Sequence, residues 1–408
     1  MIKLLRNFSR LLVGAVFIFS GFVKGIDPLG STYKFMDYFD AFGMGFLDGI
    51  ALPLAIILST AEFIIGIALF LKIRMKEISW AVLVFMIFFT GLTLYIAITN
   101  PVTDCGCFGD ALIMTNWQTF FKNVVLILLV IFIFKQRNKF VNGLKPVTEW
   151  TVFGLFIVFS VGLSLYCYNN LPLLDFRPYR VGTHIPDKMK IPEGAPQPEY
   201  KTILKYQKNG EVKEFDINNL PDSTWTWVET ENILVEEGYV PPIHDFTMDP
   251  LDGGGNIADR VLEDEGYSFL LIAYNLEDYR YENQDKINEL ASFSNNNGHR
   301  FIGLTSSSAQ EIEQYREETG GFFDFYHTDE ITLKTIVRSN PGLVLLRGGT
   351  ILGKWHHTDI PTVDEMDNKF LSYVLTHSKN ARGKLIILSF LMAFFLLIAL
   401  FQLVRKRL

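Results

Sequence analysis

The chain has 408 residues, of which 49% are apolar and 20% charged, and its formal net charge is −7. Its mean hydropathy of +0.22 is positive, which is unusual for a soluble protein and indicates a membrane protein. The acidic balance leaves no basic surface for phosphate backbones, so the composition excludes nucleic acid as a main partner. At roughly 150 residues per domain, the length allows two or three domains.

Apolar residues gather in six stretches that approach the roughly 20 residues needed to cross a hydrocarbon core. Lysine and arginine cluster before the first stretch and after the second, fourth and sixth. The positive-inside rule therefore predicts a multi-pass inner-membrane protein, embedded in the lipid bilayer, with both termini in the cytoplasm. A signal peptide is the competing interpretation of the first stretch, but no convincing cleavage site is present. The predicted spans are residues 8–23, 52–71, 78–98, 117–134, 150–168 and 385–404.

The segment between the fifth and sixth stretches, residues 169–382, is then expected to lie in the periplasm. Polar residues, Pro and Gly replace the apolar runs there, as in a soluble domain. The Asn209-Gly210 pair, between alternating apolar and polar residues, predicts a β-hairpin. The predicted organisation is a four-span membrane domain at 1–140, a fifth transmembrane helix at 149–168, a linker with a small β unit at 169–240, an α/β domain at 241–380 and a C-terminal transmembrane helix at 384–405.

The predicted α/β domain shows a regular order of elements. An apolar run at 267–274, helical spacing at 283–295 and a second apolar run at 299–304 predict a βαβ unit. A polar helix follows, and then Pro341 precedes a strand, a Gly-Gly turn and another strand. This order resembles the thioredoxin fold, in which a cis proline stands at the position of Pro341.

The active-site cysteines of thioredoxin-like oxidoreductases have no counterpart here. Such proteins need C-x-x-C directly after the first central strand, where the helix N-terminus stabilises a thiolate. This chain has Asn275-Leu276-Glu277-Asp278 in that region, and no cysteine follows Cys167. The α/β domain is therefore predicted to be redox-silent and to act as a binding or scaffolding module.

The most specific motif is Asp104-Cys105-Gly106-Cys107-Phe108-Gly109-Asp110, between the third and fourth stretches. A disulfide between Cys105 and Cys107 would close a small, strained ring and should be more oxidising than a structural disulfide. That property suits thiol exchange, although a locking disulfide within the loop is an alternative. A zinc site is a further alternative, but no other Cys or His has zinc-finger spacing, so we predict no metal.

Two more residues of the membrane region are candidates. Cys167, at the outer end of the fifth stretch, could serve as a resolving thiol, or it could simply pack in the bilayer. Glu62 lies near the middle of the second stretch, where an ionisable group is costly unless it is paired or faces a polar cavity. Lys24 could pair with Glu62 if it reaches inward, and a purely structural pair is the alternative to a functional site.

Three segments of the membrane region resemble one known family. They are RLLVGAVFIFSGFVKGIDP at 10–28, LPLAIILSTAEFIIGIALFL at 52–71 and the DCGCFGD loop. Over residues 2–136 the chain resembles the four-helix DoxX-like family that includes the methylamine-utilisation protein MauE. The resemblance implies a part in disulfide formation or processing of periplasmic enzyme subunits, together with a separate thioredoxin-like partner. It also implies that Cys105 and Cys107 form the thiol pair and that the membrane core contains Glu62, Ser20, Gly21 and Lys24.

The expected fold is thus a polytopic α-helical membrane protein, with a four-helix MauE/DoxX-like bundle, two further spans and an α/β thioredoxin-like soluble domain. The leading hypothesis is a thiol-disulfide oxidoreductase, or an accessory to one, that acts on a periplasmic client through Cys105 and Cys107. A quinone in the bundle could be the electron acceptor, although no sequence feature identifies a cofactor site. The second hypothesis is a non-enzymatic membrane subunit whose thioredoxin-like domain docks an envelope protein complex.

Overall fold

The structure is a computed structural model that describes residues 1–140, 145–197, 199–208, 210–216, 219–236, 238–364, 389, 392 and 394. Each of the first five predicted spans falls within a long apolar helix, so the chain is a multi-pass membrane protein. The sixth predicted span, residues 385–404, and the C-terminal end of the predicted α/β domain lie outside the described residues, apart from the three isolated positions. The five helices are α1 (Ile2–Ile26), α3 (Ala51–Leu71), α4 (Met75–Thr99), α5 (Asn116–Lys135) and α6 (Pro146–Tyr168).

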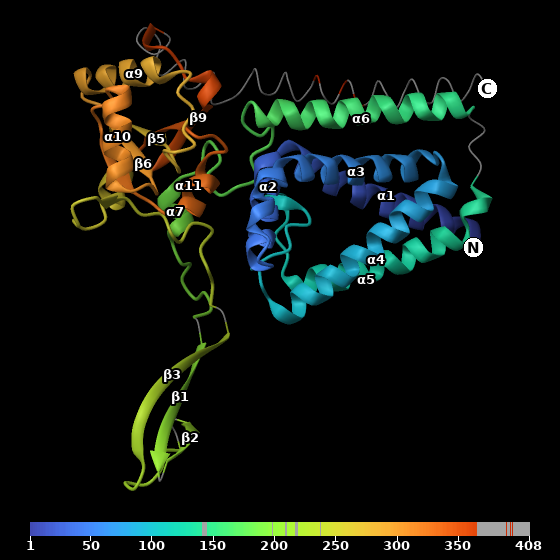
Figure 1. Cartoon of the computed structure of the whole chain (residues 1–408), viewed down its shortest axis with the longest axis horizontal. Helices are drawn as coiled ribbons and strands as arrows, with labels where there is room; N and C mark the ends of the chain where they lie inside the picture. The colour runs from blue at the N-terminus through green and yellow to red at the C-terminus, as the bar shows by residue number, and fades with distance from the viewer. Residues whose placement is uncertain are drawn as a thin grey trace.

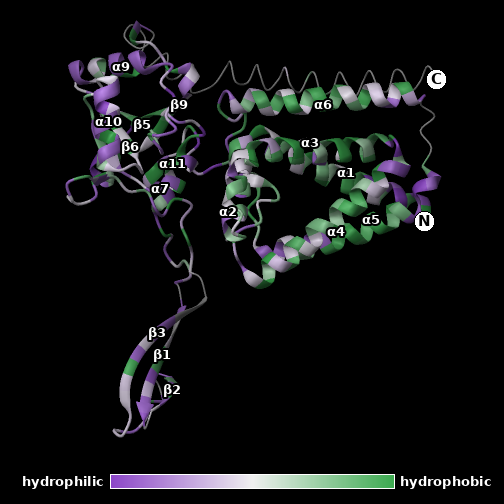
Figure 2. Cartoon of the chain, viewed as in Figure 1, coloured by the Kyte–Doolittle hydropathy of each residue, from purple (hydrophilic) through white to green (hydrophobic). Residues whose placement is uncertain are grey.

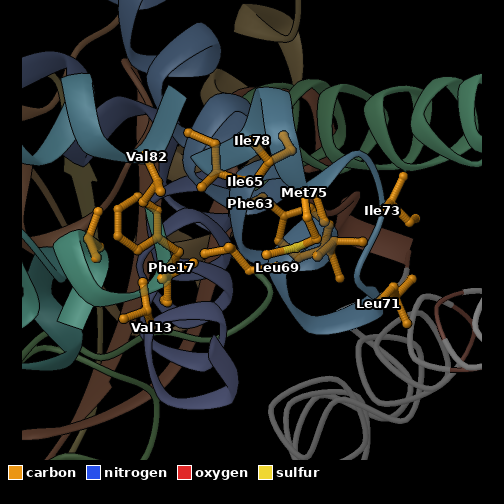
Figure 3. Packing of buried hydrophobic residues seen from close by; sticks show 14 of the residues in the cluster. Val13, Phe17, Phe63, Ile65, Leu69, Leu71, Ile73, Met75, Ile78 and Val82 are labelled. Atoms are coloured by element: carbon orange, nitrogen blue, oxygen red, sulfur yellow. The ribbon is translucent and has the colours of Figure 1, made fainter. Parts of the chain in front are cut away.

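The first four of these helices form two closely packed pairs, α1 with α3 and α4 with α5 (Figure 1). Glycine lets the backbones of α1 and α3 approach: a Cβ at Gly21 would lie 2.6 Å from the Ser59 carbonyl oxygen. Figure 3 shows part of the apolar cluster along this seam, with Val13 and Phe17 of α1 beside Leu69 of α3. Hydrophobic residues predominate along these helices (Figure 2), and many of them are exposed, for example Val84, Phe88 and Leu128, as a lipid environment requires.

A further helix that the sequence did not predict, α2 (Pro28–Ala41), lies across one end of α1 and α3 (Figure 1). Its start is specified locally, because Pro28 occupies the first turn and the Asp27 carboxylate accepts a hydrogen bond from the Gly30 nitrogen at 2.9 Å. The cysteine loop, residues 104–110, lies at the same end of the bundle and contacts α2. Two 3₁₀ turns, η1 (Gly45–Ile50) and η2 (Gly109–Ala111), complete this end.

An α/β domain follows the membrane helices. Its six-stranded sheet has the order β4-β7-β6-β5-β8-β9, with β5, β6 and β7 parallel and β8 and β9 antiparallel. Helix α9 connects β5 to β6, so the predicted βαβ unit is present. The strands are β4 (Asp249–Pro250), β5 (Tyr267–Ile272), β6 (Arg300–Thr305), β7 (Asp324–His327), β8 (Gly342–Arg347) and β9 (Thr350–His356). The helices are α7 (Ile185–Met189), α8 (Ala258–Leu262), α9 (Gln284–Asn296), α10 (Ala309–Thr319) and α11 (Glu330–Ile336), and η4 (His357–Asp359) follows β9.

The central strand β5 is buried on both faces of the sheet. Phe269 and Leu271 belong to one apolar cluster, whereas Leu270 and Ile272 belong to another. This alternation follows from the two-residue period of a strand and explains why the run is continuously apolar. The β7–α11 unit, inserted before β8, was not predicted. The Asn340–Pro341 peptide bond at the start of β8 is cis.

A three-stranded antiparallel sheet projects from the α/β domain as an arm, residues 199–236 (Figure 1). Its order is β2-β1-β3, so the predicted hairpin is its β1–β2 edge, where Lys208 pairs with Glu211. The third strand was not predicted. Asn209 of the predicted turn lies outside the described residues. The strands are β1 (Glu199–Lys208), β2 (Glu211–Asp216) and β3 (Thr226–Glu236).

The connection from α6 to the α/β domain is short. Helix α6 ends at Tyr168, and by Asp175 the chain is already anchored in the domain. The Asp175 carboxylate accepts hydrogen bonds from Lys354 of β9 at 2.8 Å and from Arg177 at 2.8 Å. These cations hold the pKa of Asp175 far below its usual range despite its burial. Only residues 169–174 therefore separate the last described membrane helix from this anchor.

Candidate functional site

The two cysteines of the cysteine loop face each other. The Cys105 and Cys107 sulfurs are 3.4 Å apart, and both are free thiols with half-buried side chains. Gly106 between them has a φ of +64°, which brings the two side chains to the same side of the turn. The Asp104 carboxylate fixes this turn by accepting a hydrogen bond from the Gly106 nitrogen at 2.9 Å.

Two side chains of α2 contact the cysteine loop and hold it in place. The Lys34 ammonium lies 2.9 Å from the Asp104 carboxylate, and the Tyr38 hydroxyl donates to the Cys105 carbonyl at 3.0 Å. The unpredicted helix thus supplies both the charge and the hydrogen-bond donor that set the position of the cysteines. A substituent at Gly106 would meet the Lys34 side chain at 3.1 Å, so this position also requires close approach.

A cluster of buried polar side chains lies next to Cys107. The Lys24 ammonium reaches inward to Glu62, at 2.7 Å from one carboxylate oxygen and 3.0 Å from the other. The Ser20 hydroxyl lies 2.8 Å from both the Glu62 carboxylate and the Cys107 carbonyl oxygen, and it can donate its one proton to either. Glu62 and Lys24 are only 4% and 9% exposed, so the pair is shielded from solvent and each charge depends on the other.

The two thiols differ in acidity because they share one proton. A hydrogen bond from Cys105, helped by the positive charges of Lys122 and Lys24, lowers the pKa of Cys107 to about 6 against the effect of burial. The same interaction and burial raise the pKa of Cys105 well above its usual range. At neutral pH the pair therefore carries one thiolate, on Cys107, which is the form that reacts in thiol exchange.

A cavity of about 460 Å³ adjoins the thiols and the polar cluster. Its lining residues come from α1, α2, α3, α4, α5 and the cysteine loop. The polar residues of its lining are Ser20, Lys24, Ser31, Lys34, Tyr38, Glu62, Cys105, Cys107, Lys122 and Asn123. Aromatic side chains supply much of the rest, namely Phe17, Phe35, Phe39, Phe42, Phe85, Phe88, Phe89 and Phe108.

The α/β domain touches the cysteine loop through a buried arginine. Arg338 Nη2 lies 2.9 Å from the Asp110 carboxylate, and its Nε lies 3.1 Å from both carboxylate oxygens of Asp27. A second contact is made by Tyr33 of α2, whose hydroxyl donates to the Tyr274 hydroxyl at 3.3 Å. Because Arg338 is two residues before Asn340, this contact joins the segment around the cis peptide bond to the loop that carries both thiols.

The remaining candidate, Cys167, lies elsewhere. It is buried in α6 within a small apolar cluster that includes Ile26 and Leu163, and it does not line the cavity. In the α/β domain, the segment after β5 is held by backbone contacts instead of carrying thiols. Asn340 donates to the Asn275 carbonyl at 2.6 Å, and the Leu276 nitrogen donates to Ser307 at 3.0 Å. Among the described residues, no three His, Cys, Asp or Glu side chains are grouped to hold a metal ion.

Comparison with protein families gives two matches. Residues 2–136 match the model described as methylamine utilisation protein MauE. The membrane region is therefore similar to this family. The matched region contains the cysteine loop, the Lys24–Glu62 pair and all side chains that line the cavity. Residues 200–237, which include most of the arm, match a domain of unknown function (DUF8463).

Other comparisons give weak likenesses. An uncharacterized conserved protein from Geobacillus kaustophilus is 13% identical, with a TM-score of 0.26, over 33% of this chain and 79% of that chain. A hypothetical protein from Sinorhizobium meliloti 1021 is 12% identical, with a TM-score of 0.25, over 32% of this chain and 80% of that chain. None of the curated proteins matches the chain.

Several site residues were not predicted from the sequence. Lys122 could have been noticed, because it is a lone cation in the first turns of an otherwise apolar span. Asp104 and Asp110 stand on either side of the cysteines, which is a local signal for partners at both ends of the loop. Arg338 carries no such signal, since its partners Asp27 and Asp110 are more than 200 residues away in the chain.

Proposed function

We propose that this MauE-type membrane protein exchanges disulfides with client proteins, with Cys105 and Cys107 as its redox pair. The observation that carries the proposal is the 3.4 Å separation of two free thiols. The lowered pKa of Cys107 supports it, because the thiolate is the reactive form. A pair that meets so closely can close and open a disulfide without moving the helices. Its small ring favours a potential in the oxidising range of exchange-active disulfides.

The chemistry runs in the direction of client oxidation. A client thiolate attacks the Cys105 sulfur of the oxidised pair, and Cys107 leaves as the more stable thiolate. The second client thiol then loses its proton and attacks the first client sulfur, which breaks the mixed disulfide. Cys105 leaves and takes up one proton. Two electrons have passed from the client dithiol to the pair, and the client holds a new disulfide.

The same proposal places the protein in the inner membrane with the cysteine loop facing the periplasm. Basic residues support this orientation, because Lys72, Arg74, Arg137 and Lys139 lie at the ends of α3, α4 and α5 that are distant from the cysteine loop. A periplasmic location is also one in which disulfides persist. The α/β domain, on the side of the cysteine loop, is then periplasmic.

We infer that the α/β domain is a thioredoxin-like module that has exchanged its redox function for positioning. Its strand order and the absence of cysteines after Cys167 support this inference. The module contacts the cysteine loop through Arg338, so a client held by the module beside this contact would lie near the thiols.

A second candidate is a non-enzymatic membrane subunit that docks an envelope complex through its α/β domain. It is favoured by the projecting arm and by the direct contact of the α/β domain with the cysteine loop. In that case, a Cys105–Cys107 disulfide would only lock the loop.

Differential alkylation and mass spectrometry of native membranes, across glutathione-buffered potentials, separate the two candidates. An exchange-active pair should show a midpoint between about −120 and −200 mV. A bond that stays closed below about −300 mV would contradict the exchange proposal and favour docking. Cys107→Ser cannot form the internal disulfide, but its Cys105 can attack a client that is supplied with its disulfide closed; without Cys107 to resolve the product, the client should stay trapped on Cys105 as a mixed disulfide. Cys167→Ser, which removes the thiol outside the cavity, is the matched control and should trap none.

A further inference from the structure

The cavity beneath the cysteines is separated into a polar end and an apolar body. Lys24, Glu62 and Ser20 are grouped at the end that adjoins the thiols. The body is formed by aliphatic and aromatic side chains of α1, α2, α3 and α4. A ligand that fits this lining has a polar head with hydrogen-bond acceptors and an apolar remainder, and a volume of about 460 Å³ is in the range of small-molecule sites.

The lining also shows from which side the ligand enters. Ile57 of α3 and Phe88 of α4 line the cavity, yet they are 62% and 63% exposed. Both lie near the middle of membrane-crossing helices, where an exposed side chain faces lipid. The cavity is therefore accessible from the hydrocarbon layer between α3 and α4, and a ligand dissolved in the bilayer can reach the thiols without passing through water.

We infer that this cavity binds a membrane quinone, with its ring at the cysteine end and its isoprenoid chain toward the lipid. The inference rests on the proposed function and supplies what that function requires, an acceptor for the electrons taken from clients. A quinone matches the site in three respects: it dissolves in lipid, its carbonyl oxygens accept hydrogen bonds, and it carries two electrons and two protons.

The reaction balances without any other component. Oxidation of the pair forms the Cys105–Cys107 bond and releases two electrons and the one proton held by Cys105. The quinone takes up these electrons, that proton and a second proton from solvent, and leaves as the quinol. The Lys24 ammonium, which points two of its three N–H groups at Glu62, lies at the end of the cavity where negative charge develops on the ring.

Binding can be tested separately from thiol chemistry. Full-length protein with the Cys105–Cys107 pair oxidised, so that it has no electrons to transfer, should bind decylubiquinone in equilibrium dialysis when it is held in lipid nanodiscs. Ala61→Phe places a ring into the cavity lining and should weaken binding at least tenfold. Ala81→Phe makes the same change on the lipid-facing side of α4 and should leave binding unchanged.

A second measurement does not depend on variants that fold. A photoreactive short-chain quinone should label the unaltered chain within α3 and α4 near the cavity, and excess decylubiquinone should displace it. Reduced protein should also convert one quinone per chain to quinol without oxygen, whereas a variant with both Cys105→Ser and Cys107→Ser should convert none.

The outcomes distinguish the two proposals. Client exchange without quinone binding, with a lipid acyl chain in the cavity, would overturn the quinone site and leave the exchange function. Quinone binding without client exchange or quinol formation would overturn the exchange function. Labelling spread evenly over lipid-facing helices, without displacement, would also overturn the quinone site.

Discussion

Arg338 of the α/β domain lies 2.9 Å from Asp110, the carboxylate that ends the cysteine motif. The same guanidinium contacts Asp27, which caps α2, so a single cation joins the α/β domain, the cysteine loop and the end of the first membrane helix. Burial raises the pKa of Asp110, and Arg338 opposes that shift. The conformation of the cysteine loop and the position of the α/β domain are therefore linked through the Arg338 side chain.

Removal of this cation should loosen the loop. Arg338→Ala leaves two carboxylates without their shared partner, and loss of a buried pair typically costs about 3–5 kcal/mol. Because the Asp110 side chain is 38% exposed, water replaces part of the interaction, and we expect a loss nearer about 2 kcal/mol. Hydrogen exchange should accelerate in residues 104–110 and in α11. Arg347→Ala, at an exposed arginine of β8, is the control, and equal exchange in both variants would contradict the link.

Removal of one charge of the Lys24–Glu62 pair should destabilise the protein more than replacement of both residues by apolar ones. Glu62→Gln leaves the Lys24 ammonium buried without a counter-charge, so we expect a loss of about 3–5 kcal/mol of stability in detergent. The double change Lys24→Met with Glu62→Met removes both charges and should recover most of that loss. Thermal unfolding of the three proteins measures the difference. A single variant as stable as the unaltered chain would show that the pair is not buried in the membrane.

The reactivity of Cys107 should follow its lowered pKa. Above a pH of about 6 Cys107 is a thiolate, so its alkylation by iodoacetamide should be nearly constant, and it should fall about tenfold per pH unit below that value. Lys122→Met removes a neighbouring positive charge and should shift the profile to higher pH. Lys135→Met, at the far end of the same helix, should leave it unchanged. A midpoint near 9 in the unaltered chain would contradict the thiolate assignment.

The close seam between α1 and α3 should not tolerate a methyl group. A Cβ at Gly21 would press on the Phe63 nitrogen and lie 2.6 Å from the Ser59 oxygen, both of which are backbone atoms. Gly21→Ala therefore forces the helices apart, and we expect a loss of at least about 1–3 kcal/mol, together with a weakened Lys24–Glu62 contact. In Gly91→Ala the new atom meets open space, so that variant should be neutral or slightly stabilised. Equal thermal stability of the two variants would refute the close contact.

The sequence predicted the membrane helices well because an apolar run of about 20 residues rarely forms anything but a membrane-spanning helix. For example, the second predicted span, residues 52–71, differs from α3 by a single residue. Helix α2 escaped because it lies across the bundle, and its mixture of aromatic and charged residues has no clear period. Its one local signal was Pro28 directly after the capping Asp27.

A contact between distant segments could be predicted only where a residue would be energetically unfavourable without a partner. An isolated Glu62 in an apolar span demands a partner, so Lys24 was a reasonable candidate, and it is indeed the partner. Arg338 lies in a polar domain, where an arginine needs no specific partner, so its contact with Asp110 was not predictable. The β7–α11 unit was missed for another reason, since a strand of four residues and a helix of seven give too few repeats for a periodic signal.

The short connection after α6 determines how strong the Arg338 contact must be to keep the α/β domain docked on the cysteine loop. Because only residues 169–174 lie between α6 and the anchor at Asp175, the α/β domain meets the cysteine loop as an intramolecular neighbour. Short linkers give effective concentrations in the millimolar range, so an interface with a dissociation constant of about 1 mM between separate proteins would already be about half formed here. A change of about 1.4 kcal/mol then alters the ratio between the docked and the undocked state of the domain about tenfold. Docking of the α/β domain on the loop that carries Cys105 can thus be tuned over a wide range by a single hydrogen bond.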